Sequence, residues 1–376
     1  MCFTSRESYA EMANSEYLTN HALTVKLWAK KLFHESLAET YFSRFLGKSA
    51  DSLVQWKDET KKSAGDRVRV GLRMQLSGTG VQADNTLEGN EESLTTYSDD
   101  LLINQLRHAC RSQGRMSEQR VMFDVLTEHK DALTDWYAAR LDTAFFNQLA
   151  GYTAETDTRY TGNNATTAPT SNNHIWVDAD VATGDESLGT TDTFTTAMLD
   201  RALTRAKTMD ANSQPIIRPF RMEGQEKYVA FLHPYQVYNL RRESTANTVT
   251  WWEVNRSALS GGLSEGAKTL YRGSLGEYNG IILHEANRCP LGVNSSTLAS
   301  ISTVRRAIFC GAQAALFGTG RESQDPSAER MTFETESFDY KNQTGVEVGM
   351  IFGLKKTVFN SRDFATIVMS SYATTP

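Results

Sequence analysis

The chain has 376 residues, of which 40% are hydrophobic, so two or three domains could each bury a core. Its 39 Lys and Arg residues against 45 Asp and Glu residues give a formal net charge of −6 at pH 7, which excludes a protein built to coat nucleic-acid phosphates. No window approaches the roughly 18 uninterrupted apolar residues of a membrane span, and the N-terminus lacks a signal-peptide pattern. We therefore expect neither a membrane protein nor a secreted one.

The first predicted element is a helix within residues 24–45. Its apolar residues recur mostly at intervals of three and four, as an amphipathic helix requires. We interpret residues 1–65 as an N-terminal arm with helical content.

Residues 66–100 are predicted to form a long hairpin. After a turn at residues 65–66, the chain alternates between apolar and basic positions with the period of a half-buried strand. The apolar positions are Val68, Val70, Leu72 and Met74, and the basic positions are Arg67, Arg69 and Arg73. A polar loop follows, and residues 94–97 are strand-like again. An isolated two-stranded ribbon is only marginally stable in water, so we expect this hairpin to pack against another surface, such as a second subunit.

A helix of unusual length is predicted after the hairpin. Ser117 is a good N-cap residue, Glu118 lies in the first turn, and no Pro or Gly interrupts the chain before Gly151. About 33 helical residues would span about 50 Å at 1.5 Å per residue. One row of this helix carries large apolar side chains at intervals of four: Leu133, Tyr137, Leu141, Phe145 and Leu149.

The rest of the chain is predicted to be mixed. Residues 152–193 are polar, with Trp176 as almost the sole large apolar residue, which favours a long surface excursion. Residues 194–209 are predicted helical, 227–232 form a strand, and Pro234 begins another helix after an extended His233. Strands are expected at 280–284 and near 306–310, and residues 331–340 and 345–372 are β-rich. The fold class is therefore α+β.

Motifs for catalysis and cofactor binding are incomplete in this chain. The GxSxG pattern at Ser264 is followed by Glu277 and His284, but the segment before it is polar rather than the buried strand that a nucleophile elbow needs. The GxG pattern at 78–80 lacks the helix that would bind a pyrophosphate. The pairs His34–Glu35 and His284–Glu285 both lack the second histidine of an HExxH zinc-binding helix. The four cysteines lie far apart, which is typical of thiols in a reducing cytoplasm. We predict no enzyme, no metal and no cofactor.

A resemblance rests on a series of short segments in a fixed order along the chain. They are AGDRV at 64–68, LEGNEE at 87–92, QLRHA at 105–109, RMSEQR at 115–120, FFNQLAG at 145–151, FLHP at 231–234, GSLGEYNG at 273–280 and GLKKT at 353–357. Together they resemble the major capsid proteins of tailed phages, in particular the family typified by short-tailed phages that package large polymerases. Through that family, the chain is similar to the Hong Kong phage capsid fold. Residues 152–193 have no counterpart in this resemblance.

The resemblance implies a division of the chain. It assigns 1–65 to an N-arm, 66–100 to an E-loop hairpin, and 101–193 to a peripheral domain with a spine helix and the surface excursion. It further assigns 194–330 to an axial domain and 331–376 to returning strands of the peripheral domain.

The function implied by the resemblance is structural. Subunits would form hexamers and pentamers that build an icosahedral shell around double-stranded DNA, head to tail so that each contact joins two different surfaces. Scaffolding, portal and decoration proteins would be partners, DNA would be touched only weakly, and the protein would be made in the host cytoplasm and reside in the virion. The expected contact residues between subunits are Arg67, Val68, Arg69, Val70, Leu72, Arg73, Met74, Glu88, Glu91 and Glu92.

Three other interpretations remain open at this point. The arginine row of the hairpin has the simpler explanation of a solvated strand face. A serine hydrolase would require Ser264 to react with a fluorophosphonate probe. A cellular surface-layer or encapsulating shell protein would require a secretion signal or a cargo-docking groove.

Overall fold

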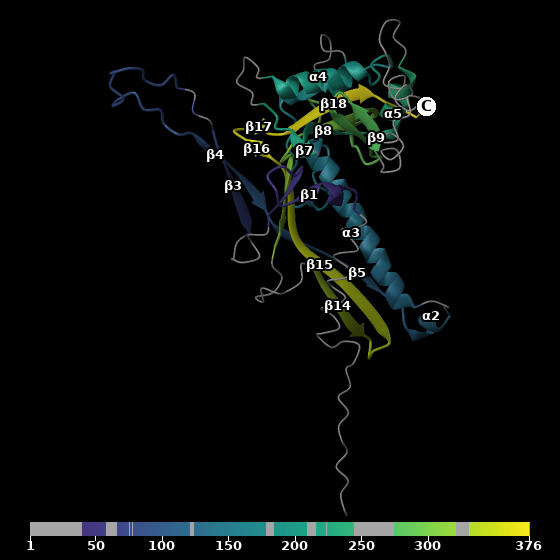
Figure 1. Cartoon of the computed structure of the whole chain (residues 1–376). Coiled ribbons are helices and arrows are strands. Elements are labelled where there is room, and N and C mark those ends of the chain that lie inside the picture. The colour runs from purple at the N-terminus through teal and green to yellow at the C-terminus, as the bar shows by residue number, and fades with distance from the viewer. Residues whose placement is uncertain are drawn as a thin grey trace, which may run out of the picture.

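Two β-sheets and one long helix form the framework of the molecule (Figure 1). The computed structural model describes residues 40–57, 66–74, 76, 78–120, 124–177, 184–208, 216–222, 224–243, 274–320 and 331–375. Most of the predicted N-terminal helix and the whole GxSxG segment lie outside these residues. Of the N-terminal prediction, the structure shows a short 3-10 helix, η1 (Tyr41–Phe45).

The first sheet has six strands. Its order is β1 (Leu46–Gly47), β2 (Val54–Lys57), β13 (Ala315–Thr319), β15 (Gln343–Lys356) and β14 (Met331–Phe338), and β5 (Asn104–Arg111) pairs with β15. The predicted alternation along β15 is confirmed, because Val346, Val348, Met350 and Phe352 are all buried. This face of the sheet packs on the long helix.

The long helix α3 (Val125–Leu149) is shorter than predicted. A separate helix, α2 (Arg115–Gln119), precedes it, so the prediction of one helix starting at Ser117 was wrong. Asp124 is the reason, because its side chain accepts a hydrogen bond from the Leu126 N–H and caps a new helix start. The predicted end is confirmed: Gly151 has φ +59°, and the Tyr152 N–H reaches back to the Asn147 carbonyl at 3.0 Å.

The second sheet has eight strands and carries α4 (Thr196–Lys207) on the side shown at the top of Figure 1. Its order is β6 (His174–Trp176), β18 (Thr366–Tyr372), β12 (Ser300–Cys310), β8 (Gln225–Leu232), β10 (Ile281–Glu285) and β9 (Ser274–Tyr278), with β11 (Leu291–Val293) on β12 and β7 (Phe220–Met222) on β8. These strands and α4 confirm the helix and strands predicted for this region.

Helix α5 (Pro234–Arg242) begins as the sequence predicts. His233 is extended and its Nδ1 accepts a hydrogen bond from the Tyr235 N–H at 3.2 Å. The Gln236 side chain in turn accepts from the His233 N–H at 3.1 Å, which completes a capping box. Burial, together with the charge of Arg305, lowers the pKa of His233 from 6.5 to about 4.

This cap predicts a dependence of stability on pH. The pKa of His233 is lower in the folded state than in the unfolded state. The contribution of neutral His233 to the free energy of unfolding is therefore fully present above about pH 6.5 and is lost as the pH falls toward about 4. We expect the free energy of unfolding to fall by about 1–2 kcal/mol over this range, because solvent screens part of the effect. Asn at this position can cap the helix but does not titrate, so His233→Asn should flatten this part of a urea-unfolding profile measured against pH. An unchanged profile would show that His233 is not responsible.

The two sheets and α3 share one hydrophobic core. Phe145 of α3 stacks on Phe42 with ring centroids 5.1 Å apart and meets Phe231 of β8 edge-on at 5.9 Å. Phe42 also contacts Phe317 of β13 at 5.9 Å. These rings join one sheet to the other.

Two strands cross the predicted domain boundaries. β13 falls within the predicted axial segment but pairs with β15 in the six-stranded sheet. β18 falls within the predicted returning strands but pairs with β12 in the eight-stranded sheet. The division into domains therefore remains a prediction, and the sheets do not follow its sequence boundaries.

The prediction of a surface excursion over 152–193 is only partly right for the described part of this segment, most of which is exposed or half-buried while a minority is buried. It contains η3 (Thr158–Tyr160), η4 (Ser171–Asn173), β6 and η5 (Asp185–Ser187). Asn163, Asn164 and Asp185 are buried. Their polar side chains lie inside because they satisfy main-chain groups and charges of distant segments. A further small ribbon, β16 (Val358–Phe359) with β17 (Arg362–Asp363), follows β15.

Candidate assembly interface

The predicted hairpin is present and projects from the body of the molecule (Figure 1). β3 (Arg67–Arg73) pairs with β4 (Thr96–Leu102) in an antiparallel register that runs from Arg67 opposite Leu102 to Arg73 opposite Thr96. These two strands form a sheet of their own. In the described part of the chain, residues 78–95 contain no helix, so the GxG pattern at 78–80 cannot serve a dinucleotide.

The apolar row of β3 is divided between the chain's own core and solvent. Val68 is 5% exposed and clusters with Leu101, Ile103 and Leu316 at the base of the hairpin. Met74, at the far end of the row, is 37% exposed. The near half of the row is therefore used within the chain, and the far half is more exposed.

Further large apolar side chains are exposed on the loop beyond the strands. Leu76, Leu87 and Leu94 have exposed fractions of 57%, 62% and 54%. Other large apolar side chains are exposed elsewhere on the subunit, but these three belong to one loop that projects from it, which makes the loop a candidate contact surface.

The arginine row does not act as one unit. Arg67 and Arg73 are exposed at the two ends of β3. Arg69 instead forms a forked pair with Asp100 of the same hairpin, with Nε–Oδ1 and Nη2–Oδ2 distances of 2.7 and 2.9 Å. The hydrogen bonds from Arg69 lower the pKa of Asp100. Arg69 thus already has a partner within the chain.

The acidic residues of the loop shape its backbone. The Glu92 carboxylate accepts from the Gly78 N–H at 2.6 Å, and the Glu91 carboxylate accepts from the Gly89 N–H at 2.8 Å. Glu88 is exposed beside them. Two of the three predicted acidic contact residues therefore have a local role as well.

Lys355 of β15 fixes the base of the hairpin and was not anticipated from the sequence. Its ammonium pairs with the carboxylate of Asp99 and donates to the Asp100 carbonyl at 2.9 Å. The other oxygen of Asp99 accepts from the Val358 N–H at 3.2 Å. The LKK run gives no hint of this contact, because Asp99 lies 256 positions away in the chain.

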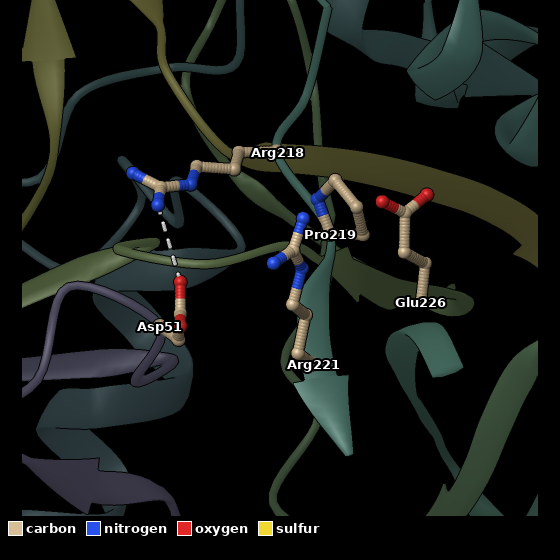
Figure 2. Close-up of a pocket in the computed structure, with 5 residues that line it drawn as sticks. All are labelled: Asp51, Arg218, Pro219, Arg221 and Glu226. Carbon is tan, nitrogen blue, oxygen red and sulfur yellow. Dashed lines mark hydrogen bonds and ion pairs between the residues drawn. The ribbon is translucent and has the colours of Figure 1, made fainter. Parts of the chain in front are cut away.

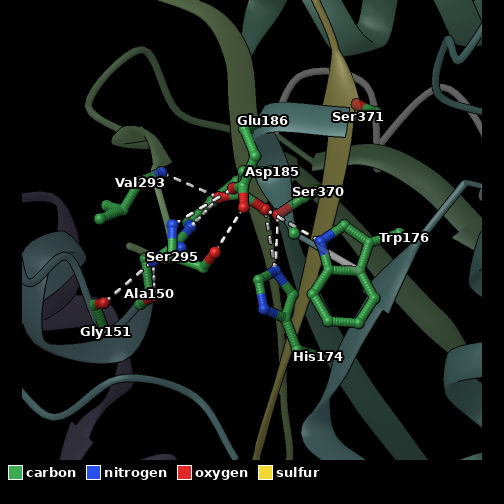
Figure 3. A network of polar contacts seen from close by, with 12 residues as sticks. Ala150, Gly151, His174, Trp176, Asp185, Glu186, Val293, Ser295, Ser370 and Ser371 are labelled. Carbon is green, nitrogen blue, oxygen red and sulfur yellow. Dashed lines mark hydrogen bonds and ion pairs between the residues drawn. The ribbon is translucent and has the colours of Figure 1, made fainter. Parts of the chain in front are cut away.

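A second buried polar group that the sequence did not reveal lies between the eight-stranded sheet and the end of α3 (Figure 3). Asp185 is fully buried and accepts from the Arg306 guanidinium at 2.8 Å, the Trp176 indole at 3.1 Å and the Val293 N–H at 2.9 Å. Burial alone would raise the pKa of Asp185, but the hydrogen bond from His174 and the charge of Arg306 outweigh it and lower the pKa. Burial also lowers the pKa of His174, so Arg306 supplies the compensating charge at neutral pH.

This group has the residue types of a catalytic triad without its geometry. His174 Nε2 lies 2.7 Å from Ser370 Oγ and 3.3 Å from the Asp185 carboxylate, so both partners share one ring nitrogen. A triad needs the serine and the acid on opposite nitrogens. Ser370 is also fully buried. The network is structural, and Arg306 extends it to the end of α3 by donating to the Gly151 carbonyl at 2.9 Å.

A surface pocket beside β7 offers no better site (Figure 2). Its lining is Asp51, Arg218, Pro219, Arg221 and Glu226, and Arg218 donates to Asp51 across 3.2 Å. Within the described residues, no group of three or more His, Cys, Asp or Glu side chains could hold a metal. No helix in the described ranges is long and apolar enough to cross a membrane. The projecting hairpin is thus the strongest candidate site.

Comparisons with known proteins place the chain in a family. The phage capsid protein family model matches residues 17–375. The major capsid protein of Pseudomonas phage KPP25 is 27% identical over 387 aligned residues, covering 94% of this chain and 96% of that protein. The solved capsid of Ralstonia phage GP4 is similar with a TM-score of 0.72 and 29% identity, covering 100% of this chain and 99% of that chain.

A more distant structure shows the same fold. The capsid of cyanophage Pam1 is similar with a TM-score of 0.70 and 20% identity, covering 98% of this chain and 97% of that chain. The predicted α+β fold of phage capsids is confirmed. Because the family model spans nearly all of the sequence, the chain belongs to the phage capsid protein family.

Proposed function

We propose that this chain is a major capsid protein whose copies assemble into the icosahedral shell of a tailed-phage head. The observation that carries the proposal is the projecting hairpin, whose base is built into its own subunit while its outer half exposes large apolar side chains. The family and the capsid structures that resemble the chain support the same function. In the virion the shell would enclose double-stranded DNA.

The proposed contact is head to tail. The hairpin of one copy binds a different surface of the next copy, and such contacts close into hexamers and pentamers. The proposed contact residues are Arg67, Leu72, Arg73, Met74, Glu88, Glu91 and Glu92, whereas Val68, Val70 and Arg69 position the hairpin. Burying roughly 300 Å² of apolar surface at about 25 cal/mol per Å² would give roughly 7 kcal/mol per contact before the entropy of association.

The net charge and the family bear on three further points: contact with DNA, catalysis and partners. A net charge of −6 suits a shell wall that holds packaged DNA only weakly. We propose a structural rather than a catalytic role, which membership of the phage capsid protein family supports. Scaffolding, portal and decoration proteins are the proposed partners, with synthesis in the host cytoplasm and residence in the virion.

Charge reversal on the hairpin tests the contact. Arg67→Glu with Arg73→Glu should leave the subunit folded but block shell formation, because the carboxylates would repel acids on the neighbouring copy. Arg69 is left unchanged, since reversing it would place a glutamate against Asp100. The measurement is sedimentation and negative-stain microscopy over a range of salt.

A matched control removes the general effect of charge. Arg115→Glu with Arg241→Glu changes the net charge equally, on exposed residues of α2 and α5 outside the hairpin. This control should assemble normally. Shells of normal yield from the hairpin variant would rule out an electrostatic contact through Arg67 and Arg73.

A further inference from the structure

Two glycines of the six-stranded sheet lie against the end of β4, where the hairpin joins that sheet. Gly318 of β13 and Gly353 of β15 are register partners. A Cβ atom at Gly353 would lie 2.1 Å from the Leu102 carbonyl oxygen, and one at Gly318 would lie 2.8 Å from Leu101 Cδ2. The Leu101 side chain could shift to admit a Cβ at Gly318, but the main-chain oxygen at Gly353 could not, so glycine is required at Gly353 for the end of β4 to pass this close to the sheet.

A buried asparagine, Asn164, holds the same point of β4 by hydrogen bonds. The Leu102 N–H donates to Asn164 Oδ1 at 3.0 Å, and Asn164 Nδ2 donates to the Leu102 carbonyl at 2.9 Å. One amide side chain thus satisfies both main-chain groups of Leu102, as a residue of a neighbouring strand would. A Cβ at Gly353 would also lie 3.4 Å from Asn164 Nδ2, so the glycine and the amide belong to one arrangement.

Asn164 is itself fixed to α3. Its carbonyl accepts from the Gln148 side chain at 2.8 Å and from the Thr161 hydroxyl at 2.6 Å. The neighbouring Asn163 donates to the Phe352 carbonyl at 2.8 Å and to the Asn104 carbonyl at 3.2 Å. The loop after α3 therefore connects the long helix, β15 and the point where the hairpin departs.

A small shift at this point would be amplified at the far end of the hairpin. The seven residues of β3 span roughly 23 Å at about 3.3 Å per residue. A tilt of about 10° at the base would move the end of the strand by roughly 4 Å, which is as large as a van der Waals contact distance. The apolar residues of the loop lie beyond this end and would move further.

We infer that Gly353 and Asn164 are positioning residues that set the direction of the hairpin and hence the geometry in which neighbouring copies associate. The inference rests on the proposed function, in which the hairpin binds the next copy. It assigns a role in assembly to two buried residues that would not touch the partner.

Gly353→Ala is the direct test. The Gly353→Ala subunit is expected to fold, with a lower thermal midpoint, and to yield closed particles about tenfold less efficiently than the unmodified chain, or particles of altered diameter. Gly189→Ala is the matched control, because Gly189 lies in an exposed loop outside the hairpin and its Cβ would meet only the Asp192 carboxylate, at 3.6 Å. The control should give particles of normal yield and diameter by cryo-electron microscopy.

Asn164→Asp is the second test of the inference, and it replaces the first if Gly353→Ala does not fold. The carboxylate keeps the acceptor for the Leu102 N–H but loses the donor to the Leu102 carbonyl. Altered particle diameter or yield in this variant supports the inference. Particles identical to those of the unmodified chain, from either folded variant, overturn it. Failure of the unmodified chain and of Gly189→Ala to assemble would instead contradict the proposed function.

Discussion

Replacing Met74 and Leu94 with glutamate is expected to abolish shell assembly and leave the isolated subunit folded. These side chains are 37% and 54% exposed in the subunit, so their loss costs the fold little. In an interface each glutamate would be an unpaired, desolvated charge. We expect the protein concentration needed for assembly to rise at least about tenfold per substitution, measured by sedimentation of assembled against free protein.

Leu298→Glu is the control for this experiment. Leu298 is also 54% exposed, but it lies at the turn between β11 and β12, away from the hairpin. This variant should assemble at the same concentration as the unmodified chain. If the hairpin double variant assembled equally well, the apolar loop would not be the contact between copies.

Asp185→Asn is expected to lower the free energy of unfolding by about 3–5 kcal/mol, far more than a substitution on the surface of the subunit would. The guanidinium of Arg306, whose side chain is only 5% exposed, would lose its counter-charge. A buried charge left without a partner costs far more than the pair itself contributes. Urea unfolding at neutral pH, followed by circular dichroism, measures the change.

The control is the same substitution in an exposed pair. Asp100→Asn removes the partner of Arg69, whose side chain is 71% exposed. Water can solvate that guanidinium, so stability should hardly change. Equal destabilisation by both substitutions would show that the junction around Asp185 does not depend on its buried charge.

Local patterns in the sequence predicted much of this fold. The alternation along β3 and β15 and the capping sequence of α5 each depend on residues that are neighbours in the chain. Such patterns predict local structure because the residues that interact are already neighbours in the sequence. The sequence did not show that Asp124 would begin α3, since nothing else in that stretch breaks the helical pattern.

Long-range partners account for what the sequence did not predict. The polar composition of 152–193 indicated exposure, yet Asn164 is buried against Leu102, 62 positions away. Asp185 likewise pairs with Arg306 across 121 positions. Composition cannot show that a polar side chain has a main-chain or ionic partner from a distant segment.

The candidate contact surface was predicted only in part. The hairpin and its two faces were correct, but the sequence could not show that Val68 clusters with Leu316 or that Arg69 pairs with Asp100. Both contacts depend on where the chain returns after the loop. They divide the predicted contact residues into those that hold the hairpin and those left for a partner.

The most direct test of a shell-building subunit is electron microscopy with sedimentation velocity on the purified full-length chain over a range of protein and salt concentrations, alone and with a co-expressed scaffolding protein. Closed particles of uniform diameter, built from rings of five and six copies, are the predicted result. A monodisperse monomer under every condition would contradict a shell-building role.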